Sequence, residues 1–156
     1  MTQSPTDYVK WFKEDPNHWQ AWNAKHLATD LKPLKNGTNI VHPVTKDRIY
    51  ANKIIIFDTG LGKWHEQTGR YIDFQVFLDT PADISLVRRS LRSLKNGDMS
   101  FAPTVDNLHW YLTEGRPLFL NTKNLKNNSN MIIPGELNID TIVNQVYKRV
   151  SILLKA

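Results

Sequence analysis

The sequence predicts an α/β fold, with a parallel sheet of about three or four strands flanked by helices. Short apolar runs at 53–57, 74–78 and 130–133 have the composition of buried strands. Segments of helical periodicity lie between and after them, most clearly over 139–154. The sharp turn Asp79-Thr80-Pro81 joins one strand directly to a helix, as in folds where strands and helices alternate.

The bulk composition describes an ordinary globular protein. The chain has 156 residues, of which 40% are hydrophobic and 22% charged, so we expect a single domain over 1–156 with a real core. It has no cysteine, which excludes disulfides and thiolate metal sites and favours a cytoplasmic location. No apolar run reaches the roughly 18 residues of a membrane span, and residues 1–7 do not resemble a signal peptide.

The formal charge of +5 favours anionic ligands, with nucleotides and nucleic acids as the two main classes. Lysines and arginines are scattered along the chain and form no block of five or more. This pattern does not favour a dedicated nucleic-acid surface.

The N-terminal third predicts two helices and an irregular segment. The first helix spans 6–15, and the second spans 17–36 with Pro33 in its last turn and Asn36-Gly37 as its end. Their three tryptophans are expected in the core, with stacking on a flat ligand as the alternative. Residues 38–52 are expected to be irregular.

The middle of the chain predicts the elements that would carry a site. The run 53–57 suits a central strand ending at Asp58, and 74–78 suits a second strand. A helix over 81–95 follows, with acids at its start and arginines toward its end, which suits the helix dipole.

The last third predicts two helices, a loop and a strand. A helix over 103–114 starts at Pro103 or Thr104, and Gly115 follows its end. A polar loop covers 118–129. The third strand at 130–133 ends at Pro134-Gly135, before the C-terminal amphipathic helix.

Several charged side chains have both a functional and a structural interpretation. Asp58 can be interpreted as a magnesium ligand or as a turn-capping residue. For Asp79 the same two interpretations exist, and the capping role is favoured. The arginines on the helix after Pro81 are phosphate contacts or part of a solvated face; they are Arg88, Arg89 and Arg92. Ligands of open α/β folds bind beyond the carboxyl ends of the strands, where all of these residues are expected.

These segments, in this order, resemble P-loop small-molecule kinases of the uridine kinase, phosphoribulokinase and pantothenate kinase group, most closely the uridine kinase branch. The resemblance covers roughly residues 15–155. The segments that carry it are 53–60, 71–92, 112–123 and 130–135, together with the helix and turn over 19–37.

The resemblance implies a three-layer P-loop-kinase-like parallel sheet and ATP-dependent phosphoryl transfer to a nucleoside or another small-molecule hydroxyl. It implies Mg²⁺, with Asp58 as its ligand and a catalytic residue, and ATP as co-substrate. Arg88 and Arg92 would be catalytic, and these two with Arg89 would bind phosphate. Pro134 and Gly135 would lie beside the nucleotide base.

The chain departs from that family in its phosphate loop. No G-x-x-x-x-G-K-[ST] sequence occurs, and Gly60-Leu61-Gly62-Lys63 lacks the spacing that lets backbone amides converge on phosphates. We therefore expect the N-terminal strands and the Walker A loop of the fold to be missing, and little kinase activity from this chain alone. The alternatives are a non-catalytic remnant or partner of a split P-loop protein, pairing with a P-loop-bearing chain or a second copy, and a phosphate- or nucleic-acid-binding domain.

Overall fold

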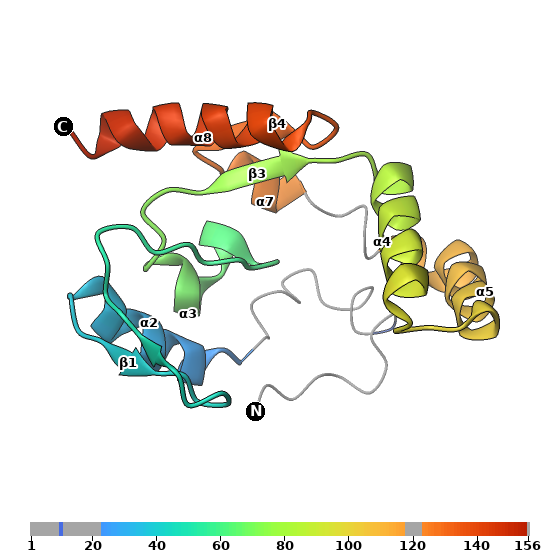
Figure 1. Ribbon diagram of the computed structural model, residues 1–156, viewed down its shortest axis with the longest axis horizontal. Coiled ribbons are helices and arrows are strands. Elements are labelled where there is room, and N and C mark those ends of the chain that lie inside the picture. Colours follow the sequence, from blue (N-terminus) through green and yellow to red (C-terminus); the bar gives the residue numbers. More distant parts are fainter. Residues whose placement is uncertain (1–9, 11–22, 118–122, 156) are drawn as a thin grey trace. The chain divides into compact units, whose positions relative to one another are not determined.

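The computed structural model describes residues 10, 23–117 and 123–155 (Figure 1). The chain divides into two compact units, each described here by itself. The first unit comprises Met1–Gln75 with Asn127–Ser129, and the second comprises Val76–Lys126 with Asn130–Ala156. Apart from Lys10, the predicted helix over 6–15 and the three N-terminal tryptophans lie outside the described residues.

Helix α2 (Lys25–Lys35) opens the described part of the first unit. The prediction of one helix from Asn17 is wrong, because Asn23 and Ala24 are not helical. The Ala24 backbone amide instead donates to Gln67 Oε1 at 2.8 Å, a tertiary bond that sets where the helix begins. The predicted end is confirmed: Asn36 caps the helix, Pro33 lies inside its last turn, and Gly37 follows with φ of 80°.

The segment predicted to be irregular contains a small antiparallel hairpin, so that prediction is wrong for four residues. Strand β1 (Ile40–Val41) pairs with β2 (Arg48–Ile49), with Ile40 opposite Ile49. His42 closes the turn, since its Nδ1 accepts from the backbone amides of Val44 and Thr45 at 3.3 and 3.0 Å. A side chain that satisfies turn amides leaves no periodic signal in the sequence.

The predicted central strand at 53–57 is also wrong. The described residues 53–59 form no strand, and Ile56 is 91% exposed. A run with the composition of a strand forms one only where a neighbouring strand pairs with it. The described strands pair with one another and not with this run. After this segment the chain forms the short helices η2 (Gly62–Trp64) and α3 (Glu66–Gly69).

The first unit is organised around buried polar side chains. His65 and Thr68 are fully buried, and His65 Nδ1 lies 2.8 Å from Thr68 Oγ1. Gln75 accepts from the Lys63 amide and donates to Ser129 Oγ at 2.8 Å. These bonds satisfy groups that would otherwise be costly to bury. Through Gln75 they also join Lys63 to Ser129, so the two stretches of chain that make up the first unit are linked.

The second unit contains the predicted parallel pairing. Strand β3 (Val76–Asp79) lies parallel to β4 (Met131–Pro134), with Val76 opposite Met131 and Asp79 opposite Pro134. Ile133 is fully buried. The α/β class is therefore confirmed, but within the described residues the parallel sheet has two strands and not the three or four predicted.

Two helices follow β3. Helix α4 (Ala82–Asn96) begins after Pro81 and ends at Gly97 in the left-handed conformation, as predicted. Helix α5 (Phe101–Trp110) begins directly after Ser100, before the predicted start at Pro103 or Thr104, and continues as the π-helical segment η3 (Tyr111–Gly115). Gly115 lies inside this helix, and a Cβ added to it would overlap the Trp110 ring. The prediction that Gly115 follows the end of the helix is therefore wrong.

The remaining elements flank β4. Helix α7 (Lys123–Asn127) occupies part of the predicted 118–129 loop, so that prediction is wrong for these residues. Helix α8 (Ile139–Leu153) matches the predicted C-terminal helix, and the Asn138 side chain caps it by accepting from the Thr141 amide at 2.8 Å. Within the described residues, no helix is long and apolar enough to cross a membrane.

Candidate functional site

The carboxyl edge of the β3–β4 sheet brings together the turns that follow the two strands. Asp79 and Pro134 are paired as the last residues of their strands, and the Gly135 amide donates to the Asp79 carbonyl at 3.0 Å. Thr80 also lies against Gly135, so closely that a Cβ on Gly135 would overlap the threonine side chain. Glycine is therefore required here by close approach, and the two turns form one rigid edge.

Arg88 reaches this edge from α4. Its Nη1 donates to the Gly135 carbonyl at 2.8 Å. The predicted phosphate-binding helix and the predicted nucleotide-binding turn, 47 positions apart, are thus in direct contact. A guanidinium has five N–H donors in a planar fork, so one bond to a carbonyl is compatible with further contacts to an anion.

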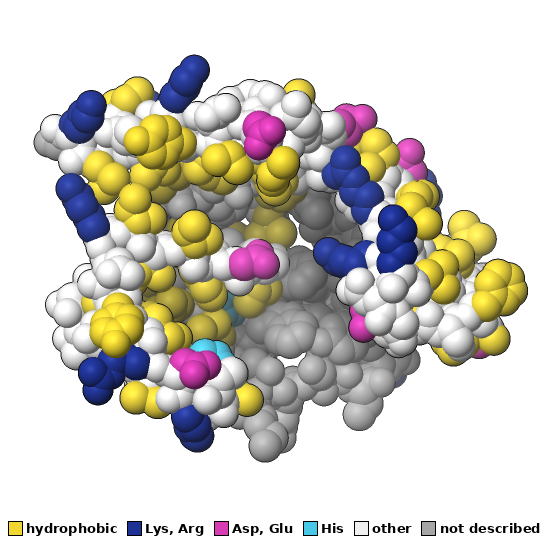
Figure 2. All heavy atoms as spheres, in the orientation of Figure 1, with side chains coloured by type: hydrophobic (Ala, Val, Ile, Leu, Met, Phe, Trp, Pro, Cys, Tyr) yellow, Lys and Arg dark blue, Asp and Glu magenta, His cyan; other side chains and the backbone are white. Residues whose placement is uncertain are grey.

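The other two predicted arginines extend the basic surface along α4. Arg92 is exposed one turn beyond Arg88, on the same side of the helix. Arg89 Nη2 donates to Asn107 Oδ1 on α5 at 3.4 Å, so this arginine also links the two helices. Figure 2 shows Lys and Arg side chains gathered over α4. The structure thus places all three arginines on one helix that starts at the sheet edge.

Asp79 is ion-paired and does not cap the following helix. Its Oδ2 lies 2.5 Å from Lys126 Nζ, and no side-chain hydrogen bond caps the start of α4, so the capping interpretation is wrong. Sequence reasoning missed Lys126 as a member of this edge. The only available signal was a lysine in a polar segment shortly before a strand, and such lysines are usually solvated.

Asp58 lies in the first unit, whereas the arginines lie in the second. It is exposed and follows a segment that is not a strand, so the predicted strand end does not position it. Among the residues that the structure describes, no group of three or more His, Cys, Asp or Glu side chains could hold a metal ion. Its role as a magnesium ligand stays a prediction from the resemblance.

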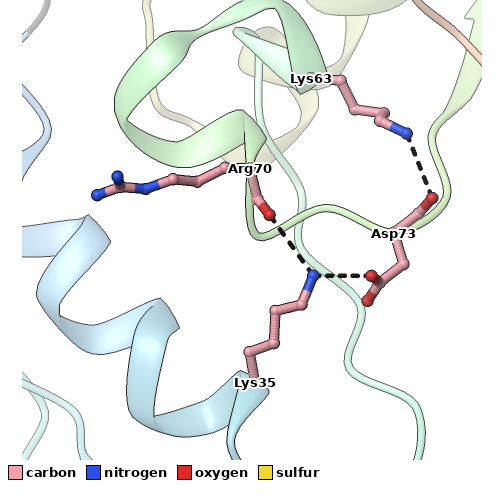
Figure 3. Close-up of polar contacts among 4 residues, drawn as sticks. All are labelled: Lys35, Lys63, Arg70 and Asp73. Carbon is pink, nitrogen blue, oxygen red and sulfur yellow. Dashed lines mark hydrogen bonds and ion pairs between the residues drawn. The ribbon is translucent and has the colours of Figure 1, made fainter.

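A second polar cluster lies in the first unit and joins the end of α2 to the segment before β3 (Figure 3). Lys35 Nζ lies 2.7 Å from Asp73 Oδ1 and 3.5 Å from the Arg70 carbonyl. Lys63 Nζ donates to the Asp73 carbonyl at 3.3 Å. The Arg70 guanidinium lies 5.0 Å from the centroid of the Tyr71 ring, in a cation–π contact. These bonds fix the 70–73 turn, which is a structural role.

The described residues thus form an α/β protein in which a helix with three arginines starts at the carboxyl edge of a parallel strand pair. No protein-family model matches the chain. Its sequence is similar to curated uridine kinases. It is 28% identical to the uridine kinase of Haemophilus influenzae strain Rd over 128 residues, which is 76% of this chain and 59% of that protein.

Two further relatives show the same similarity. The uridine kinase of Enterobacter sp. strain 638 is 30% identical over 118 residues, 69% of this chain and 54% of the relative. The uridine kinase of Pasteurella multocida is 28% identical over 128 residues, 76% and 58% of the two chains. The chain thus spans less than two thirds of the length of these relatives. The matches support the predicted uridine kinase-like relationship.

Proposed function

We propose that this chain binds nucleotide phosphates at the carboxyl edge of β3–β4, in a uridine kinase-like role: ATP-dependent phosphoryl transfer to a hydroxyl of a nucleoside or another small molecule. The observation that carries the proposal is the bond from Arg88 to the Gly135 carbonyl. It joins the two segments in which family resemblance suggests phosphate and base contacts. Similarity to uridine kinases over 76% of the chain supports the same assignment.

The arginines would act by position and charge. Phosphoryl transfer spreads negative charge over the transferred oxygens, and fixed cations stabilise that charge in the transition state. Arg88 is held at the edge by Gly135, and Arg92 lies one turn further along α4. Pro134 and Gly135 would form the wall against which the nucleotide base lies. The close packing of Gly135 on Thr80 would keep that wall rigid.

The described residues include cations that suit the phosphates of a magnesium nucleotide, but no group of three or more side chains that could hold the metal ion. Mg²⁺ keeps several waters and needs only one or two carboxylates beside the phosphates, a role that Asp58 would fill by resemblance. Bound there, the ion would neutralise phosphate charge. Because these 156 residues contain no G-x-x-x-x-G-K-[ST] loop, we expect this chain by itself to bind nucleotide with little or no turnover.

The test is calorimetric titration of the purified chain with ATP and Mg²⁺, beside the Arg88→Ala/Arg92→Ala double variant. We expect the double variant to weaken binding at least about tenfold, because two charge-assisted contacts are removed. Lys148→Ala/Arg149→Ala, at two exposed positions of α8, is the matched control for the loss of two positive charges and should bind like the parent. Equal binding by all three proteins, or no binding by the folded parent, would refute the proposal. A phosphoryl-transfer assay with uridine then measures turnover.

A second function, as a partner module for another chain, is favoured by the exposure of the parallel strands. Leu78 is 50% and Ile132 47% exposed, and the pairing register places them on opposite faces of the sheet. Parallel sheets are normally covered on both faces. Sedimentation velocity over a concentration series tests association with a second copy, and co-expression with a P-loop-bearing chain tests the complementary partner. A strictly monomeric chain that captures no such partner would exclude this function.

A further inference from the structure

Lys126 contacts the carboxyl edge of β3–β4 through an ion pair between positions that are distant in sequence. It lies on α7, 47 positions after Asp79, and its ammonium nitrogen is 2.5 Å from Asp79 Oδ2. Asp79 is the last residue of β3, and its backbone carbonyl accepts from the Gly135 amide. The residue that binds the ammonium group is therefore hydrogen-bonded through its backbone to the turn that Arg88 contacts.

This ion pair is accessible to solvent. The Lys126 side chain is 41% exposed and that of Asp79 is 46% exposed. Water screens both charges at such exposure, so the pair is weak and its partners can exchange. A polyphosphate offers more negative charge than a single carboxylate, and lysine is a flexible point charge that can follow it.

The charges around the edge favour an anion. Lys126 and Arg88 supply two cations against the single carboxylate of Asp79. Arg89 and Arg92 add two positive charges further along α4, while Asp83 in the first turn of that helix and Glu136, directly after Gly135, add two negative charges. The four cations exceed the three carboxylates by one, so a polyphosphate approaching the edge is attracted to it at low ionic strength.

We propose that Lys126 is an anion-contact residue of the carboxyl edge: Asp79 holds its ammonium group in the free protein, and a bound polyphosphate takes the group over. The inference rests on the proposed phosphate-binding function of the same edge and adds a residue to it. The competing explanation is that the ion pair only fastens α7 to β3.

The two explanations predict opposite effects for Asp79. If the pair only fastens two elements, removing either partner lowers stability alike and leaves anion affinity nearly unchanged. If Asp79 holds a lysine that the anion uses, Lys126→Met weakens anion binding and Asp79→Asn strengthens it. Asp79→Asn also removes a repulsive charge, so the double variant is needed: the gain should largely disappear when Lys126 is absent.

The experiment titrates inorganic tripolyphosphate, without metal, into the full chain at low ionic strength. We expect Lys126→Met to bind about fivefold to tenfold more weakly, Lys126→Arg to stay near the parent, and Asp79→Asn to bind severalfold more tightly. Lys148→Met, an exposed lysine of α8, is the matched control for loss of one positive charge. Circular dichroism and thermal unfolding establish that each variant is folded, and Lys126→Gln replaces Lys126→Met if the latter is not.

The outcomes separate the two proposals. If the Arg88→Ala/Arg92→Ala variant loses tripolyphosphate while Lys126→Met matches Lys148→Met, the inference on Lys126 is wrong and the phosphate edge stands. If the parent protein does not bind tripolyphosphate, both the proposed phosphate-binding edge and the proposed role of Lys126 are wrong. Equal destabilisation by Lys126→Met and Asp79→Asn, with unchanged affinity, assigns the pair to fastening alone.

Discussion

Two segments of this chain share a sequence pattern, an apolar run followed by Asp-Thr, but they fold differently. Residues 76–79 form β3 and pair with β4, and Asp79 is fixed at the strand end. Residues 53–57 form no strand, although they are richer in isoleucine, and Asp58 is exposed. The difference shows that a parallel neighbour, which supplies the backbone hydrogen bonds, decides whether such a run becomes a strand. Strand pairing also decides which of the two aspartates lies at the edge of a sheet: Asp79 does, at the end of β3.

The largest expected effect comes from comparing an isoleucine of β4, the strand that pairs with β3, with an isoleucine of the unpaired 53–57 run. Ile133→Ala should lower the free energy of unfolding by about 2–4 kcal/mol, because it leaves a cavity in place of a fully buried side chain. Ile56→Ala should change it by less than about 0.5 kcal/mol, because Ile56 is already exposed. Urea denaturation followed by circular dichroism measures both. Similar losses in the two variants would mean that the 53–57 run is packed as tightly as β4.

The next effect concerns the glycine that follows β4 and the glycine that follows the 53–57 run and its Asp-Thr pair. Gly135→Ala should cost about 1–3 kcal/mol of stability, because the new Cβ would overlap Thr80 and force the edge to move. The matched control is Gly60→Ala, since nothing lies within 4 Å of a Cβ added there. Thermal unfolding gives the stabilities, and ATP titration shows whether the edge is disturbed. A Gly135→Ala protein with parental stability and affinity would show that the edge is not rigid.

The smallest effect concerns the two aspartates. Asp79→Asn should lower stability by at most about 1 kcal/mol, because its ion pair with Lys126 is half exposed, and the loss should shrink as salt is added. For Asp58→Asn we expect no measurable change in stability. Denaturation at low and high sodium chloride compares them. A larger loss of stability in Asp79→Asn that did not depend on salt would mean that the ion pair is less accessible to water than its exposed fraction indicates.

Local patterns anticipated the elements whose signals are local. Helix α4 was expected between Pro81 and Gly97, because proline suits the first turn and glycine suits the left-handed end. Helix α8 follows a periodic apolar pattern, and β4 ends at the predicted Pro134-Gly135 turn. The turn around His42 depends on a side chain bonding to backbone amides, and α7 lies in a segment without apolar periodicity, so neither was anticipated.

The candidate site also contains residues that the sequence could indicate and contacts that it could not. Arg88, Arg89 and Arg92 could be selected from the sequence, because a basic helix after a strand end suggests an anion. The bond from Arg88 to the Gly135 carbonyl and the pairing of Lys126 with Asp79 could not, because each joins positions 47 residues apart. Without homologous sequences, such distant contacts leave no trace in a single chain.

The sequence by itself determined the α/β class, the helices α4 and α8, the parallel strand character of 76–79 and 131–134, and the basic character of α4. Tertiary structure decided that 53–57 is not a strand, that Asp79 pairs with Lys126, and that Arg88 contacts the turn after β4. The physical reason is the range of the interactions. Propensity, periodicity and capping act within a few residues, whereas strand pairing and charge pairing depend on which distant segment becomes a neighbour.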